Sequence, residues 1–168
     1  AGPRYIRSYP IRALSGSAGP KLSEGDRQVP EGLYRIVGFN PNSAYHLSMK
    51  LDYPNAFDSK QAAAEGRTRP GSDIFIHGKA VSVGCLAMGD RSIEELFMLA
   101  RDVGMAHIGV AIAPTDPRAG PLPVDAGPAW TAELYRNIET FFASYQRRGA
   151  GRLLAPTGPR GDVIRLWT

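Results

Sequence analysis

Residues 73–90 read DIFIHGKAVSVGCLAMGD, and they hold the only cysteine of the chain, Cys85. The apolar run IFIH at 74–77 predicts a short buried strand that ends at His77. Seven residues separate His77 from Cys85, which is enough for the chain to turn back and bring the two side chains together. Two interpretations follow: Cys85 is a buried apolar side chain, or it is a nucleophile whose base is His77.

Nucleophilic chemistry at Cys85 needs a base and an oxyanion site, and the neighbouring residues offer both. A thiol with its reference pKa of about 8.5 is mostly protonated at neutral pH, whereas a histidine with a pKa of about 6.5 can accept its proton. Ser82 can orient His77 through its hydroxyl or its carbonyl, and the N–H groups of Gly84 and Cys85 can donate to an oxyanion. Gly78 and Gly84 permit positive φ in the turn and close approach of a substrate. The concentration of these groups favours the nucleophile.

Length and composition indicate one globular domain. The chain has 168 residues, of which 43% are hydrophobic and 21% charged, so it can bury a core of its own. Its net charge of +4 favours an anionic partner, but only Arg147 and Arg148 are adjacent arginines, so nucleic acid is not the expected partner. No apolar run approaches the roughly 18 residues of a membrane helix, so no transmembrane segment is expected. A single cysteine excludes a disulfide within the chain.

Alternating patterns and short apolar runs predict five strands. These strands cover residues 4–12, 33–39, 45–51, 74–77 and 106–112. His107 falls inside the last strand and is expected to be structural. The segments 56–72 and 113–127 are expected to be long loops, which serve either as lids and binding loops or as plain connections.

The spacing of apolar residues predicts two helices. The first covers residues 92–103, with Ser92 and Glu95 spaced as a capping box, and it ends at Gly104. The second covers residues 128–149 and begins with a proline. Their buried stripes are predicted to consist of Ile93, Leu96, Phe97 and Ala100 in the first helix, and of Leu134, Ile138, Phe141, Phe142 and Tyr145 in the second.

Two separated motifs resemble one protein family. The stretch I-H-G…S-V-G-C resembles the active-site signature of the YkuD-type L,D-transpeptidases, in which a histidine-glycine pair precedes [ST]-x-G-C. The segment GPKLSEGDRQVPEGLY at 19–34 is similar to that family's G-P-K…E-G-D-x-x-x-P-E-G-x-Y block. The stretch HLSMKLDYPNAFD at 46–58, the G-C-x-A-M ending at 84–88 and the closeness of His77 to Cys85 resemble the YafK-like branch.

The resemblance implies a fold class that is mainly β with α (α+β), a compact mixed β-sheet with two main helices. It covers roughly residues 9–148 and implies a single catalytic domain over residues 1–168. The family's usual opening strand would precede Arg4 and Tyr5, so we expect that strand to be missing from this chain.

By resemblance, the chain is a peptidoglycan L,D-transpeptidase of the periplasm or cell envelope, a monomer that uses no metal or organic cofactor. Cys85 attacks a carbonyl next to diaminopimelate in a donor stem peptide and forms a thioester. The side-chain amine of an acceptor diaminopimelate then resolves the thioester into a cross-link, between two third stem residues or between a first and a third. In this scheme His77 moves the protons, Gly84 and Cys85 hold the oxyanion, and Ser82 holds His77.

Two departures from the main family bear on substrate recognition. Only four residues separate His77 from Ser82, a much shorter spacing than in the main branch. Ala87 stands where the main branch has an arginine, so another cation must read a substrate carboxylate if that arginine does so. The candidates are Arg67, Arg69 and Arg91, each of which is otherwise a surface charge.

Substrate-binding residues are predicted on the same basis. They are His46, Tyr53, Arg67 and Gly78. His46 and Tyr53 match the branch pattern and are expected to line the cleft, although core packing explains them as well.

Three other functions stay open. Some YafK-like members are hydrolases that cleave the bond between diaminopimelate and an attached lipoprotein, with water in place of the amine. A metal site could be built from His46, His77, His107 and Cys85, but no H-x-x-x-H or C-x-x-C spacing supports it. A non-catalytic binding module of the cell envelope would retain the fold with an unreactive Cys85.

Overall fold

The computed structural model describes residues 5–146 and 163–167 of the chain. Its strands are β1 (Tyr5–Pro10), β2 (Gly32–Ser43), β3 (His46–Leu51), β4 (Phe75–His77), β5 (Leu86–Ala87), β6 (Gly109–Ile112) and β7 (Val163–Trp167). Its helices are α1 (Ala56–Ala64), α2 (Asp90–Val103) and α3 (Thr131–Gln146), and a 3-10 turn, η1 (Met105–His107), precedes β6.

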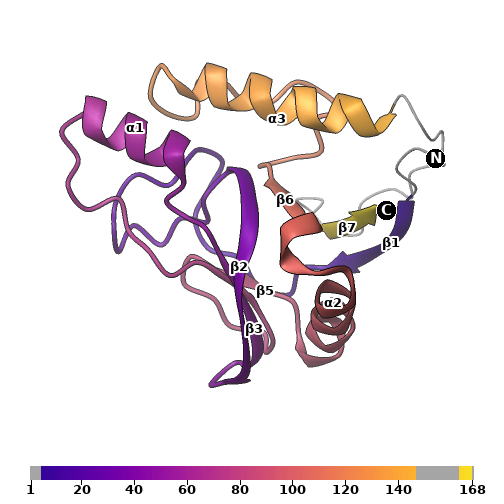
Figure 1. Cartoon of the computed structure of the whole chain (residues 1–168). Helices are drawn as coiled ribbons and strands as arrows, with labels where there is room; N and C mark the ends of the chain where they lie inside the picture. Colours follow the sequence, from indigo (N-terminus) through magenta and orange to yellow (C-terminus); the bar gives the residue numbers. More distant parts are fainter. Residues whose placement is uncertain (1–4, 147–162, 168) are drawn as a thin grey trace.

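The central sheet has the strand order β5-β4-β3-β2-β6. Its neighbouring strands are antiparallel except for β4 and β5, which run parallel, so the sheet is mixed. β1 pairs with β7 in a separate two-stranded sheet, which brings the first and last described strands side by side (Figure 1). Because β4 and β5 are so short, the loop 78–85 is long enough to carry the chain back to the start of the parallel neighbour.

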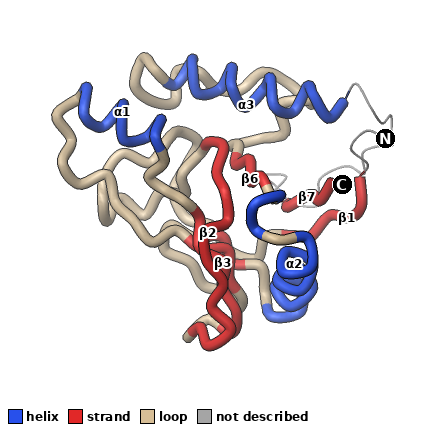
Figure 2. Tube along the Cα trace, viewed as in Figure 1, coloured by secondary structure: helices blue, strands red, loops and turns tan. Residues whose placement is uncertain are grey.

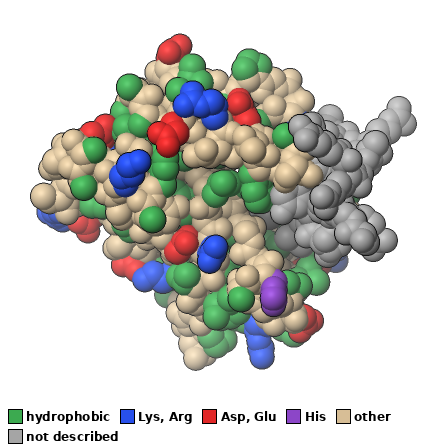
Figure 3. Space-filling model, turned by 45° about the horizontal axis from the view of Figure 1, so that its top comes forward, with side chains coloured by type: hydrophobic (Ala, Val, Ile, Leu, Met, Phe, Trp, Pro, Cys, Tyr) green, Lys and Arg blue, Asp and Glu red, His purple; other side chains and the backbone are tan. Residues whose placement is uncertain are grey.

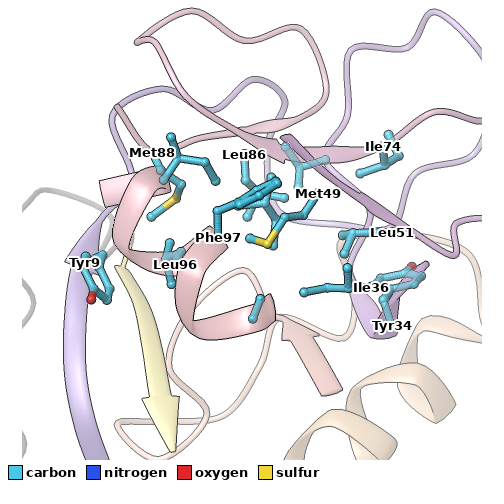
Figure 4. Packing of buried hydrophobic residues seen from close by; sticks show 14 of the residues in the cluster. Tyr9, Tyr34, Ile36, Met49, Leu51, Ile74, Leu86, Met88, Leu96 and Phe97 are labelled. Atoms are coloured by element: carbon cyan, nitrogen blue, oxygen red, sulfur yellow. The ribbon is translucent and has the colours of Figure 1, made fainter. Parts of the chain in front are cut away.

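α2 covers one face of the sheet and builds the main core. Its apolar residues recur three and four positions apart, as expected for a helix with one buried face. They pack against strand residues that alternate toward the same face. Figure 4 shows Leu96 and Phe97 of the helix among Met49, Leu86 and Met88.

α3 builds a second, smaller core at the other end of the molecule. Its buried residues Leu134, Tyr135 and Ile138 pack with Leu122. Phe57 of α1 meets Trp130, just before α3, with ring centroids 5.9 Å apart. In Figure 1, α1 and α3 lie at the same end of the molecule, away from α2. Figure 2 shows long loops between α1 and the strands below it.

The observed architecture confirms the predicted α+β class with a mixed sheet. The two predicted main helices occur as α2 and α3, and the described residues form a third helix, α1, that was not predicted. α1 lies inside the segment 56–72 that was predicted to be a loop. Its side chains make only a weak helical stripe in which Gln61 and Ala62 are buried, so the apolar spacing that identifies a helix is missing. Asn55 starts it, with a side chain that accepts from the N–H groups of Phe57 and Asp58.

The predicted capping box of Ser92 and Glu95 is wrong. α2 begins two residues earlier, at Asp90, because Gly89 takes a φ of 78° and turns the chain from β5 into the helix. No side chain caps this helix start within the described structure. The carboxylate of Glu95 instead accepts from Arg7 and from the hydroxyl of Tyr9.

Four of the five predicted strands occur with bounds close to those expected, and the fifth is shorter. Residues 106 and 107 belong to η1 rather than to a strand, so the prediction that His107 lies in a strand is wrong. The second predicted helix begins three residues late, at Thr131. Residues 147–149 and the side chain of Tyr145 lie outside the described part of the chain. The segment 113–127 is a loop, as predicted.

The surface carries charges of both signs. On the face drawn in Figure 3, side chains of Lys and Arg alternate with those of Asp and Glu rather than forming a single-sign stripe. Among the described residues, no helix is long and apolar enough to cross a membrane.

Candidate active site

His77 ends β4, and Cys85 lies one residue before β5, the parallel neighbour of β4. β4 and β5 are parallel, with Ile76 beside Leu86 and His77 beside Ala87. Cys85 directly precedes Leu86, the partner of Ile76, so Cys85 and His77 each lie one residue from this pair. The predicted return of the chain alongside β4 is confirmed, whereas the approach of the thiol to the imidazole stays a prediction.

The imidazole of His77 is buried and held in one orientation. His77 is 4% exposed, and its Nδ1 lies 2.7 Å from the carbonyl oxygen of Gly78. Because a carbonyl only accepts, Nδ1 carries the proton, and Nε2 is left as the basic nitrogen. Burial lowers the pKa of His77 more than the Gly78 carbonyl raises it. The imidazole is therefore neutral at pH 7, the state required of a general base.

Gly78 supports His77 rather than leaving room for a substrate. A Cβ at this position would lie 2.6 Å from the carbonyl oxygen of Tyr45 and 2.8 Å from a carboxylate oxygen of Asp90. Its φ is not positive, in contrast to the expectation for the turn, whereas Lys79 next to it has a φ of 56°. The ring of Tyr45 also packs against His77, with centroids 4.7 Å apart. Close packing at Gly78 thus fixes the carbonyl that orients the base.

The thiol of Cys85 is half-buried and protonated at rest. It points toward the carbonyl oxygen of Asp73, 3.8 Å from Sγ. Burial raises the pKa of the thiol, while the N–H of Phe75 and the charge of Lys21 act to lower it. Both side chains lie in the described part of the chain, and no hydrogen bond joins the thiol to the imidazole of His77 there. The resting pair is therefore a neutral thiol and a neutral imidazole.

The hydroxyl of Ser82 bonds the backbone of Cys85 and makes no described hydrogen bond to His77. Ser82 Oγ accepts from the N–H of Cys85 at 2.9 Å and donates to the carbonyl of the same residue at 2.5 Å. The expectation that this hydroxyl orients His77 is wrong, because the Gly78 carbonyl occupies Nδ1. A serine or threonine three residues before the cysteine thus closes the loop by a local side-chain to backbone bond.

Gly84 has the positive φ that the sequence predicts, at 93°. Its N–H donates to the hydroxyl of Ser15 at 2.6 Å, and that hydroxyl donates to the carbonyl of Arg27 at 2.7 Å. Both backbone donors expected at the oxyanion site, Gly84 and Cys85, are thus bonded to serine hydroxyls in this structure.

Among the described hydrogen bonds, none joins the predicted substrate-binding residues His46 and Tyr53 to the thiol of Cys85. The ring of His46 is partly exposed and lies 2.7 Å from a carboxylate oxygen of Glu94. Tyr53 is 5% exposed, belongs to the main core and donates to the carbonyl of Pro70, which favours the packing alternative. Their role in substrate binding stays a prediction.

The arginines proposed to read a substrate carboxylate have partners of their own. Arg67 donates to Glu65 and to the carbonyl of Leu22. Arg69 is paired with Glu24, and Arg91 lies 4.0 Å from Glu95 on an exposed stretch of α2. The contacts of Arg67 join the end of α1 to the loop 20–28, so it has a structural task whether or not it binds a substrate.

A separate groove of about 500 Å³ lies between α1, β2 and α3. It is lined in part by Tyr34, Asn55 and Asp58, and none of the predicted catalytic residues line it. Burial raises the pKa of Asp58 to about 6, although the N–H of Asn55 and the hydroxyl of Tyr34 act to lower it.

Sequence patterns missed two residues beside the nucleophile, Ser15 and Lys21. Ser15 lies in a stretch of turn residues that gives no signal for its contact with Gly84, 69 positions later. Lys21 lies in the G-P-K block, and a lysine that is only 8% exposed is rare, but burial cannot be read from that block alone. Among the described residues, no group of three or more His, Cys, Asp or Glu side chains is arranged to hold a metal ion.

The chain belongs to the YkuD family of L,D-transpeptidase catalytic domains, because the model of that family matches residues 2–110. In Escherichia coli, the protein named "Putative L,D-transpeptidase YafK" is 36% identical over 116 residues, in strain K12 and in O157:H7 alike. The match covers 66% of this chain and 45% of the relative, so the chain spans about half the length of the curated relatives it matches.

Solved structures show a weaker similarity. The helical cell shape determining protein Pgp2 from Campylobacter jejuni is 27% identical, with a TM-score of 0.44 over 53% of this chain and 33% of Pgp2. Bd1075 from Bdellovibrio bacteriovorus is 20% identical, with a TM-score of 0.41 over 76% of this chain and 45% of Bd1075. Both scores lie below 0.5, so the family assignment rests on the sequence match.

Proposed function

We propose that this chain is a peptidoglycan L,D-transpeptidase of the cell envelope whose nucleophile is Cys85, and that residues 1–168 form a single catalytic domain. The observation that carries the proposal is the arrangement of His77: it ends the strand whose parallel neighbour starts one residue after Cys85, and the Gly78 carbonyl leaves its Nε2 as the base. Family membership supplies the substrate class, the stem peptides of peptidoglycan with their diaminopimelate side chains.

The first step forms a thioester. Rotation about the Cα–Cβ bond of Cys85 turns Sγ from the Asp73 carbonyl toward His77, which takes the thiol proton as sulfur attacks the donor carbonyl. A C–S bond forms, the C–N bond to the C-terminal part of the stem breaks, and the imidazolium returns the proton to the leaving amine. Because thiol and imidazole are both neutral at rest, proton transfer accompanies the attack.

The oxyanion of this step needs donors that are bonded to serine hydroxyls at rest. The N–H of Gly84 exchanges the hydroxyl of Ser15 for the oxyanion, which is the stronger acceptor because it is charged. The N–H of Cys85 makes the same exchange with Ser82.

The second step resolves the thioester. His77 deprotonates the side-chain amine of an acceptor diaminopimelate, which attacks the acyl carbon; a C–N bond forms and the C–S bond breaks. The thiolate then recovers its proton from the imidazolium. One amide is exchanged for another, so the atoms balance without a further co-reactant. Water in place of the amine gives a hydrolase from the same thioester.

The test is mass spectrometry of muropeptides after purified cell walls are incubated with the protein. The samples are the wild type, Cys85→Ala, His77→Ala and, as a matched control, His107→Ala, which changes an exposed histidine in η1. New dimers are expected with the wild type and His107→Ala. Cys85→Ala should be inactive but folded, and His77→Ala should be slower by roughly 10²- to 10⁴-fold.

Three results would contradict the proposal. Shortened monomers or released peptide without dimers would assign a hydrolase on the same chemistry. Product formation by Cys85→Ala would remove Cys85 from the reaction. No change of the cell walls with any sample would favour a non-catalytic binding module.

A further inference from the structure

Lys21 is a buried cation with a fixed position. It is 8% exposed, and its ammonium donates to a carboxylate oxygen of Asp26 at 2.5 Å and to the carbonyl of Ser23 at 2.9 Å. The same carboxylate accepts the N–H groups of Leu22, Ser23 and Gln28, so it organises the whole loop 20–28. Asp26 therefore holds the ammonium in one place.

Loop 20–28 packs against two segments near Cys85, one at Gly71 and one at Gly84. At its start, the side chain of Lys21 runs past Gly71, where a Cβ would lie 2.8 Å from Cε of the lysine. Two residues after Gly71, the carbonyl of Asp73 receives the thiol of Cys85. At the end of the loop, the carbonyl of Gln28 lies 3.4 Å from where a Cβ of Gly84 would be. The loop that holds the ammonium thus packs against the segment 71–73, whose Asp73 carbonyl receives the thiol of Cys85.

The charges around Cys85 differ in what they do. Lys21 acts to lower the pKa of the thiol, whereas the carboxylate of Asp73 acts to raise it. Asp73 is itself bound by Lys50 at 2.7 Å, so the charge of Lys50 is directed to that carboxylate. His77 is buried and neutral at rest. Lys21 is thus the cation of loop 20–28 whose charge acts on the thiol.

We propose that Lys21 is a positioning residue of the nucleophile, whose buried ammonium stabilises the thiolate of Cys85 as the proton leaves. The effect of Lys21 on the pKa of the Cys85 thiol can be measured without a substrate. Its place in catalysis rests on the proposed function. Cys85 is half-buried, so its thiolate loses part of its hydration. A nearby cation or N–H group can stabilise the thiolate in place of that water.

The experiment is the rate of alkylation by iodoacetamide as a function of pH. Because the chain has one cysteine, the modified thiol is always Cys85. The variants are Lys21→Gln, which removes the charge, Lys21→Arg, which keeps it, and Asp26→Asn, which removes its counter-ion. Lys60→Gln is the control, because Lys60 is an exposed residue of α1.

Lys21→Gln is expected to raise the thiol pKa by about one, which means roughly tenfold less thiolate at neutral pH. Lys21→Arg and Lys60→Gln should keep the wild-type value. Asp26→Asn keeps the Oδ1 oxygen that accepts from the ammonium but removes the counter-ion charge, so it should lower the thiol pKa. A residue with only a structural role would loosen the loop in both variants and would move the pKa in the same direction.

An unchanged thiol pKa in Lys21→Gln would overturn the proposal, and so would a shift in the same direction in Lys21→Gln and Asp26→Asn. If Lys21→Gln does not fold, Asp26→Asn decides, and an unchanged or raised pKa overturns the proposal. The outcome is independent of the muropeptide experiment. Cross-linking activity with no effect of Lys21 would overturn this inference alone, and a shifted pKa without activity would leave it standing while the proposed function fails.

Discussion

Two serine hydroxyls hold the backbone on either side of the thiol. Ser82 bonds both backbone groups of Cys85, and Ser15 bridges Gly84 to Arg27. A buried or half-buried N–H without an acceptor is costly, so each hydroxyl satisfies a donor that awaits the oxyanion. Under the proposed mechanism, the same backbone N–H groups would exchange these serine hydroxyls for the oxyanion.

Replacing Ser82 tests the resting role. Ser82→Ala should destabilise the protein by about 1 kcal/mol and lower activity, because the loop loses its local bond, whereas Ser82→Thr keeps a hydroxyl and should remain near the wild type. Urea denaturation and muropeptide turnover measure the two effects. Equal activity of Ser82→Ala and wild type would show that the hydroxyl is not needed to shape the loop.

We expect protonation of His77 to set the acid limit of activity. Burial lowers its pKa, so the imidazole stays neutral, and able to accept the thiol proton, to a lower pH than an ordinary histidine. We expect the acid limb of kcat/KM to lie below the reference value of about 6.5. A pH–rate profile of the wild type measures this limb, and NMR titration of the imidazole gives an independent value. A limb at or above the reference value would mean that another group controls it.

At the scale of elements, α1 is stabilised more by the capping box at its start than by an apolar stripe. Its side chains form little apolar stripe, and its start is held by a capping box in which Asn55 and Asp58 bond each other's N–H groups. Asp58 also lies beneath Tyr34, whose hydroxyl is 3.4 Å from its carboxylate. The capping box at the start of α1 therefore includes a partly buried acid, Asp58.

Asp58 should make the stability of the protein depend on pH. Its pKa is about 6 in the folded state and 3.8 ordinarily, so the folded state binds the proton more tightly. Its contribution is fully present below pH 4 and is lost as the pH rises to about 6, a fall of roughly 1–3 kcal/mol in the free energy of unfolding.

Urea denaturation at a series of pH values measures this contribution. Asp58→Asn should remove the dependence between pH 4 and 6, while Asp125→Asn, in an exposed loop, should retain it. The same slope in wild type and Asp58→Asn would contradict the assignment.

Across the whole molecule, Glu31 connects the loop of the active site to α3. It is 4% exposed, accepts the N–H of Gly19 at 2.9 Å and accepts the hydroxyl of Tyr135 at 2.6 Å. Tyr135 is 104 positions later in the chain. The segment that leads into Lys21 is therefore tied to the second core by one buried carboxylate.

Removing the Tyr135 hydroxyl should weaken this connection. Tyr135→Phe leaves a buried carboxylate oxygen without its donor and should lower the free energy of unfolding by about 1–3 kcal/mol. Thr140→Ala is the control, because its hydroxyl bonds a carbonyl of its own helix at an exposed position. Chemical denaturation measures both variants. Equal stability of Tyr135→Phe and Thr140→Ala would mean that water replaces the hydroxyl at Glu31.

Local patterns were sufficient wherever the cause of a feature is local. Alternation predicted β2 and β3, apolar spacing predicted the body of α2, and a two-motif resemblance predicted the family that the comparison confirms. They failed at α1, whose stripe is weak, and at the start of α2, where a glycine reverses the chain. They also failed for β5, because a two-residue strand has no pattern of its own.

The sequence alone determined the class of fold, the family and the pair of residues to examine, because His77 and Cys85 lie within nine positions and their neighbours form a recognisable signature. Only the tertiary structure decided which groups serve that pair. The positions of the Gly78 carbonyl, the Ser15 hydroxyl and the Lys21 ammonium follow from burial and from contacts between segments of the chain. Such contacts depend on the register of β4 and β5 and on the packing of loop 20–28, which no local pattern encodes.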